Sequence, residues 1–264
     1  MSSDFLYNLK TMLALLSRDL RIQLFNLRTT IENTIIIVFF GYLNYGYFLP
    51  LLGMKQELIV PVFLGIVIFM FFSVAFRRAL LEAIDLKDHH LIRYQVILPL
   101  SKNWLIIKYV CSFFSLLFLS SFPIFIFAKI LLGVKLNLFF LIRPSFWCTY
   151  LVSLFFVSTF FLFLIFKYSY DWFSASFWPR VLLPMEFFGC TLYTWKNLNL
   201  GLPNFAKWIL LNPMTYVNEG IRASILNDSV NYISPWICVL VLLFFSLFNV
   251  VFLNYTFKSR LDLP

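Results

Sequence analysis

The sequence predicts an all-α integral membrane protein with six transmembrane helices, an N-terminal amphipathic helix in the membrane interface, and short re-entrant helices between spans five and six. Hydrophobic residues make up 61% of the 264 residues and charged residues 12%, whereas a soluble domain is about half apolar and a quarter charged. Five uncharged runs can each cross the hydrocarbon core, which takes about 20 helical residues. A sixth apolar segment is interrupted by proline and glycine. No soluble domain is expected, so residues 1–264 form one membrane domain.

These runs locate the spans, and each is continuous rather than alternating in hydrophobicity, as helices require. The uncharged runs are Asn33–Met54, Leu58–Phe76, Tyr109–Ala128, Pro144–Phe166 and Ser229–Phe257, and the interrupted one is Val181–Trp195.

Residues 1–31 precede the first span and carry apolar residues every three or four positions, which on a helix form one stripe. Arg18, Arg21 and Arg28 lie off this stripe. The pattern predicts a helix in the interface, with its apolar side in lipid and its arginines toward anionic headgroups. It serves either as a simple membrane anchor or as a connecting helix that contacts a cytoplasmic partner.

Span one (about 33–52) and span two (about 58–80) are joined by a very short turn and therefore form an antiparallel hairpin. Tyr42 and Tyr45 place polar groups in span one. Such groups face protein or a cavity in many membrane proteins, so we expect them beside a path for a hydroxyl-rich cargo. An aromatic belt at the outer interface is the other interpretation.

Residues 77–103 form the most charged part of the chain, and residues 83–103 within it, which contain Asp85, Asp88 and Arg93, are the predicted coupling region. Because this segment is expected on the cytoplasmic side, it is the best candidate to receive force from a soluble subunit. The alternative is a solvated loop that only sets the topology. His89 and His90 point about 100° apart on a helix, so no metal site is predicted.

Spans three (about 104–130) and four (about 144–166) are rich in phenylalanine, and span five is expected to begin near Trp178. Glu186 then lies at membrane depth. A charged side chain at the bilayer centre costs about 2.5–3.5 kcal/mol on insertion scales, so such residues face the bundle interior and are functional candidates. A protonated or locally satisfied glutamate is the structural alternative.

Residues 196–228 are predicted to form an outer re-entrant region, because broken backbone at membrane depth needs protein or a wet cavity around it. Asn212 can cap a helix and Pro213 suits the first helical position. Glu219 and Arg222 follow at i, i+3 and are close enough to pair. Asn227 and Asp228 end this helix.

Charge placement orients the chain. Fourteen of the 21 Lys and Arg residues fall on one side if six spans are assumed and both termini are cytoplasmic, which agrees with the positive-inside rule. No basic cluster with interleaved aromatics lies on a soluble face, so nucleic acid is not expected as a partner.

The stretch Asn-Pro-Met-Thr-Tyr-Val-Asn-Glu-Gly-Ile-Arg, placed between a broken span and one final span, resembles the C-terminal half of ABC-2 type transport permeases. Asn212, Pro213, Glu219 and Arg222 match the family pattern, and Met214 stands where leucine is usual. Pro99, Leu100, Ser101 and Lys102 are similar to the sequence that precedes the third span in that family. The region Tyr232–Pro235 is more similar to exporters of capsule, O-antigen and teichoic acid than to drug exporters.

The resemblance implies the membrane subunit of an ATP-driven exporter in a bacterial inner membrane, as a homodimer with two ATPase subunits. Its coupling region would include Asp85, Asp88, Arg93, Pro99, Leu100 and Lys102, and its pathway or gate would include Tyr42, Tyr45, Glu186, Asn212, Pro213, Glu219 and Arg222. The cargo would be amphipathic, such as a lipid-linked polysaccharide.

The chain contains no G-x-x-x-x-G-K-[ST] phosphate loop, so ATP and Mg²⁺ are expected on the partner subunit and no cofactor on this chain. The alternatives are an ABC-2 permease for a drug or another small hydrophobic molecule, a membrane-embedded lipid-modifying enzyme, and a passive channel or assembly factor. No catalytic motif favours the enzyme.

Overall fold

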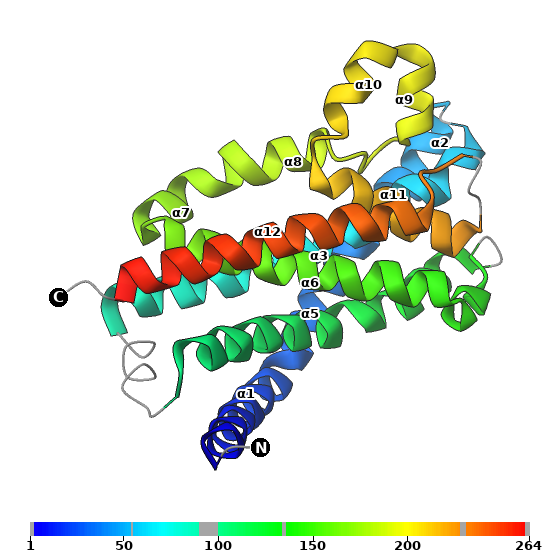
Figure 1. Cartoon of the computed structure of the whole chain (residues 1–264). Coiled ribbons are helices and arrows are strands. Elements are labelled where there is room, and N and C mark those ends of the chain that lie inside the picture. Colours follow the sequence, from blue (N-terminus) through cyan, green and yellow to red (C-terminus); the bar gives the residue numbers. More distant parts are fainter. Residues whose placement is uncertain (1–2, 54, 90–99, 134–135, 228–230, 262–264) are drawn as a thin grey trace.

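Helices account for all the regular secondary structure in the computed structural model, which describes residues 3–53, 55–89, 100–133, 136–227 and 231–261 (Figure 1). The described part contains no strand. Five of its helices are long and apolar enough to cross a membrane: Phe5–Leu51, Ile59–Lys87, Lys102–Leu132, Pro144–Lys167 and Pro235–Phe257. The prediction of an all-helical protein with several membrane-crossing helices is therefore confirmed.

Two of these helices form the centre of the bundle. They are α3 (Ile59–Ile84) and α6 (Pro144–Lys167). In the most apolar 18-residue stretch of each helix, 89% and 72% of the residues are buried. In the corresponding stretches of α1 (Ser3–Tyr42) and α12 (Pro235–Leu261), only 11% and 28% of the residues are buried. Because no bilayer surrounds the protein here, the exposed apolar faces of α1 and α12 are the surfaces that lipid or a second protein chain would cover.

The core between α3, α6 and α5 (Lys102–Leu132) is built from aromatic rings. Phe71 of α3 and Phe125 of α5 meet with ring centroids 6.0 Å apart, and each contacts the ring of Tyr150 on α6. The buried Tyr150 hydroxyl pairs with the hydroxyl of Ser121 at 2.8 Å. The phenylalanines of α3, α5 and α6 therefore contribute to the protein interior.

The two ends of the bundle differ in character (Figure 1). At one end lie η3 (Asp85–His89), the start of α5, the junction of α6 with α7 (Tyr170–Phe177) and the end of α12. At the other end lie α2 (Leu49–Leu51), η5 (Leu138–Ile142) and the short helices α9 (Trp195–Gly201) and α10 (Pro203–Ile209). We call these the charged end and the short-helix end.

The segment that was predicted as span five differs from the prediction. Its helix runs through α7, η6 (Trp178–Leu182) and α8 (Leu183–Phe187) without a break, so it begins at Tyr170, before the expected start near Trp178, and ends before the segment 188–194. Ser169 caps its start. Pro179 and Pro184 do not break it, because the π-helical turn absorbs the first and the second stands at the start of α8. Its 18 residues would extend about 27 Å.

The N-terminal region also differs from prediction. Residues 3–42 form one helix that continues through η1 (Leu43–Phe48) and α2, so no boundary separates an interfacial helix from span one near residue 31. A helix of 47 residues is about 70 Å long, roughly twice the hydrocarbon core. The uncharged run begins at Asn33, but the helix hydrogen bonds continue through the polar part before it.

Candidate functional site

The most enclosed polar structure in the described chain is α11 (Pro213–Leu226), in which every residue from Met214 to Ile225 is buried. As predicted, Asn212 caps the helix: its Oδ1 accepts the N–H of Met214 at 3.0 Å, and Pro213 occupies the first helical position. At the other end, Asn227 adopts a left-handed conformation with φ of 56°, a common helix terminator. The guanidinium of Arg143 donates to the carbonyl oxygen of Ser224 at 3.2 Å.

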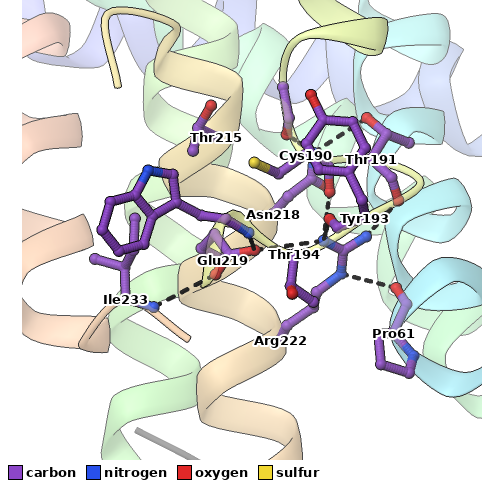
Figure 2. Close-up of polar contacts among 12 residues, drawn as sticks. Pro61, Cys190, Thr191, Tyr193, Thr194, Thr215, Asn218, Glu219, Arg222 and Ile233 are labelled. Carbon is purple, nitrogen blue, oxygen red and sulfur yellow. Dashed lines mark hydrogen bonds and ion pairs between the residues drawn. The ribbon is translucent and has the colours of Figure 1, made fainter. Parts of the chain in front are cut away.

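Arg222 is the centre of this structure, and its side chain has no exposed surface. Nε donates to the carbonyl oxygen of Pro61 on α3 at 2.7 Å. The two Nη atoms donate to the carbonyl oxygens of Cys190, Thr191 and Tyr193 (Figure 2). One side chain therefore ties α11 to both α3 and the irregular segment 188–194.

Glu219 lies one turn before Arg222 and is equally buried. Its Oε1 accepts the N–H of Trp195 at 3.1 Å, and its Oε2 accepts the N–H of Ile233 at 3.4 Å (Figure 2). Its Oε1 lies 3.6 Å from Nη1 of Arg222, which confirms the predicted pairing. A buried carboxylate needs such partners, because an isolated charge in a protein interior costs several kcal/mol. Glu219 thus fixes the start of α9 and the approach to α12.

Two further side chains of this region hold the segment after α8. Asn218 donates to the carbonyl oxygen of Gly189 at 2.7 Å, and Asn212 donates to that of Met185 at 2.9 Å. The irregular segment is thus hydrogen bonded along its length to α11. This satisfies the requirement that non-helical backbone within a membrane protein find internal partners.

Two glycines allow this close approach. A Cβ at Gly65 of α3 would overlap the carbonyl oxygen of Thr191 and Nη2 of Arg222. A Cβ at Gly220 would lie 2.8 Å from Cβ of Cys238 on α12. The backbones of α3, α11 and α12 therefore meet at distances that a larger residue would not permit.

The network of Arg222, Glu219, Asn218 and Asn212 with their backbone partners is called the α11 staple below. Its polar groups bond to the protein's own backbone. Beyond it, α9 and α10 project from the bundle (Figure 1), with Trp208 of α10 70% exposed. The staple therefore holds the segment that leads into α9 and α10 against α11 and α3.

The other predicted pathway residues lie outside the staple. Tyr42, at the end of α1, is half-buried and meets the ring of Phe63 on α3 at 5.6 Å. Tyr45 is half-buried in η1. Glu186, predicted to face the bundle interior, is also only half-buried, near the end of α8. The fully enclosed acid of this end is Glu219.

A second buried polar cluster was not predicted. On α1, Asp19 is 6% exposed and its Oδ2 lies 2.6 Å from Nζ of Lys108 on α5, which is 2% exposed. One turn later, the amide of Gln23 donates to the carbonyl oxygen of Ser112 at 2.9 Å and accepts the hydroxyl of Ser115 at 3.1 Å. The spacing of Asp19 and Gln23 at i, i+4, matched by Lys108 and Ser112 on span three, is the signal that would have revealed it.

The face of α1 that meets the protein therefore includes polar side chains, and the predicted apolar stripe is partly exposed, as a lipid-facing stripe would be. Phe5, Leu13 and Leu24 are 38%, 50% and 55% exposed. Arg21 and Arg28 point outward as expected, but Arg18 also bonds to Asp19 at 2.9 Å.

The predicted coupling residues fall only partly within the described chain. Asp85 begins η3, and Leu100 and Lys102 flank the start of α5. The side chain of Asp88 and the whole of Arg93 and Pro99 lie outside the described residues. Nearby, Lys87 pairs with Asp171 of α7 at 2.7 Å, which joins η3 to α7.

Among the described residues, no group of three His, Cys, Asp or Glu side chains converges as metal ligands would. No protein-family model, curated protein or solved structure matches this chain.

Proposed function

We propose that this chain is the transmembrane permease subunit of an ATP-driven exporter, with a separate ATPase subunit bound at the charged end. The proposal rests on the resemblance of Asn212–Arg222 and Pro99–Lys102 to ABC-2 permeases. One structural observation supports it most directly: a single helical path, residues 3–51, extends from the charged end to the short-helix end.

Contacts between α1 and α5 make this path suitable for transmitting motion. At the charged end, the ring of Phe5 meets that of Trp104 at 5.3 Å, and Asn8 accepts the N–H of Ser101 at 3.3 Å. Further along, the ion pair of Asp19 with Lys108 joins α1 to α5. A displacement of the start of α5 would therefore carry α1 with it.

At the short-helix end, the α11 staple connects α3 to the segment that carries α9 and α10. In the proposed mechanism, ATP-driven closure of two ATPase subunits pushes residues 85–102 and the N-terminal part of α1. The helices then move as packed bodies, since close-packed interiors do not deform continuously. The result would be displacement of α9 and α10, which act as the outer gate of the pathway.

The proposed assembly contains two copies of this chain and two ATPases in a bacterial inner membrane, with both termini cytoplasmic. The proposed cargo is a lipid-linked glycan. Its sugar part would contact polar groups such as those of Tyr42 and Tyr45, and its lipid part would contact an apolar surface open to the bilayer. Export of a drug or another small hydrophobic molecule is the second candidate, and it is favoured by the largely apolar surface of α12.

The proposal is tested by purifying the full chain from native membranes in mild detergent. A P-loop ATPase should be retained in a fixed ratio, and its ATP hydrolysis rate should change when this chain is removed and added back. Deletion of the gene should leave a lipid-linked glycan on the inner leaflet. Purification without an ATPase, or an ATPase whose rate is indifferent to this chain, would rule the proposal out.

A further inference from the structure

A pocket of about 230 Å³ lies between α1, α3 and α5, away from the α11 staple. Its volume is several times the roughly 30 Å³ that one water occupies in the liquid. Polar and apolar side chains line different parts of it. The polar lining is Gln23, Asn26, Thr30, Arg77 and Arg78, and the apolar lining is Ile22, Val74, Leu81 and Leu116.

The charge in this pocket is positive and incompletely neutralised. Arg78 pairs with Glu82 of the next turn, and the nearby Asp19 pairs with Lys108 and Arg18. Nη2 of Arg77 is buried and has no hydrogen-bond partner among the described residues, and the same is true of Nε of Arg78. Buried guanidinium donors without acceptors are costly, so an anionic group with several acceptor oxygens fits this space.

The position of the pocket along the helix indicates where that anion comes from. Arg77 follows the start of α3 at Ile59 by 18 residues, which corresponds to about 27 Å of helix rise. This is close to the hydrocarbon thickness of a bilayer. If α3 enters the membrane near Ile59, Arg77 therefore lies at the level of the opposite leaflet's phosphates.

The apolar wall of the pocket faces outward. Ile22 of α1 is 50% exposed and Leu81 of α3 is 60% exposed, and both belong to the lining of the pocket. A lipid with its phosphate at Arg77 would place its first methylene groups against these two side chains. A free ion would make no apolar contact with them.

We infer that this pocket binds the phosphate of an anionic membrane lipid, with Arg77 as the principal donor and Ile22 and Leu81 in contact with the glycerol and upper acyl chain. Arginine suits this role because its planar fork donates two hydrogen bonds to a phosphate. The inference does not depend on the transport proposal, since a bound lipid of this kind would equally serve a protein with another activity.

The test uses the purified full chain in neutral detergent, with binding of phosphatidylglycerol measured by native mass spectrometry. Arg77→Gln should weaken binding about tenfold, the ratio expected for one charge-assisted hydrogen bond. The control is Lys55→Gln, which removes one positive charge from an exposed side chain that follows α2 and should leave binding unchanged. Equal weakening by both variants, or by neither, would overturn the inference.

A second variant distinguishes loss of the site from loss of the fold in Arg77→Gln. Ile22→Trp fills the mouth of the pocket and leaves every charge in place, so it should weaken phosphatidylglycerol binding by a similar factor; unchanged binding would count against the pocket. A large excess of inorganic phosphate should not displace the lipid. Displacement would instead assign the site to a free anion.

Discussion

At the residue scale, the fold depends on one buried cation. Arg222 bonds to four backbone carbonyl groups from two separate segments and to one carboxylate. Three of these carbonyl groups, those of Cys190, Thr191 and Tyr193, lie in an irregular segment, where a buried backbone oxygen without a donor is costly. The side chain therefore supplies the hydrogen bonds that a regular helix would have made within itself.

Replacing Arg222 by methionine should destabilise the protein by about 3–5 kcal/mol, because Glu219 would stay buried without a cationic partner. Thermal unfolding in detergent measures this effect. Arg28→Gln, at an exposed ion pair of α1, should leave the unfolding midpoint unchanged. A midpoint for Arg222→Met equal to that of the wild-type protein would show that the staple is not needed for stability.

Gly65 is the second residue that we expect to be intolerant of change. Gly65→Ala should lower the unfolding midpoint and increase proteolysis of segment 188–194, because the added Cβ overlaps Thr191 and Arg222. The control is Gly201→Ala in α9, where nothing lies within 4 Å of the added atom. Alanine gains up to about 1 kcal/mol over glycine inside a helix, so this control should be neutral or slightly stabilising. Equal behaviour of the two variants would contradict the close packing at Gly65.

The sequence correctly predicted Asn212 as a helix cap and Pro213 as the first helical residue. It also predicted the ion pair of Glu219 with Arg222, since all of these features depend on local spacing. It could not indicate that Arg222 bonds to Pro61, 161 positions away, since distant contacts leave no periodic pattern. The sequence could not indicate either how far Glu186 is buried, because its half-buried environment is set by where α8 ends.

At the element scale, the boundaries of the uninterrupted spans were predicted well. Spans three and four were expected at 104–130 and 144–166 and are Lys102–Leu132 and Pro144–Lys167. Continuous apolar runs bounded by charges determine such helices without help from tertiary contacts. The fifth span was misplaced because Pro179 and Pro184 were taken as breaks, whereas a π-helical turn accommodates Pro179.

The pairing of α1 with α5 is the strongest test of an element. Asp19→Asn should destabilise the protein by about 3–5 kcal/mol, because it removes the carboxylate that neutralises the buried ammonium of Lys108. Lys108→Met should cost less, because Asp19 keeps its bond to Arg18. The double variant should lose much less than the sum of the two. A double-mutant cycle on unfolding midpoints measures this coupling. Strict additivity would show that the two side chains do not interact in solution.

At the scale of the whole molecule, the charged end and the short-helix end are joined by helices that run the length of the bundle (Figure 1). The sequence predicted this polarity from the distribution of Lys and Arg, but it did not predict that residues 3–51 form one helix. That continuity depends on polar side chains of α1, because Asp19 and Gln23 bond to Lys108 and Ser112 on α5.

The most direct measurement of the central claim is labelling of a cysteine at the exposed position Lys207 of α10, in a background without the four native cysteines. The chain is reconstituted with its ATPase in vesicles, and a membrane-impermeant maleimide is added from either side. A cysteine at exposed Lys10 serves as the control for the opposite side.

An ATP-driven permease predicts that position 207 is labelled only from outside, that position 10 is labelled only from the ATPase side, and that hydrolysable ATP changes the labelling rate at position 207 severalfold. Labelling of position 207 from the ATPase side, or a rate there that ATP hydrolysis does not change, would contradict the account.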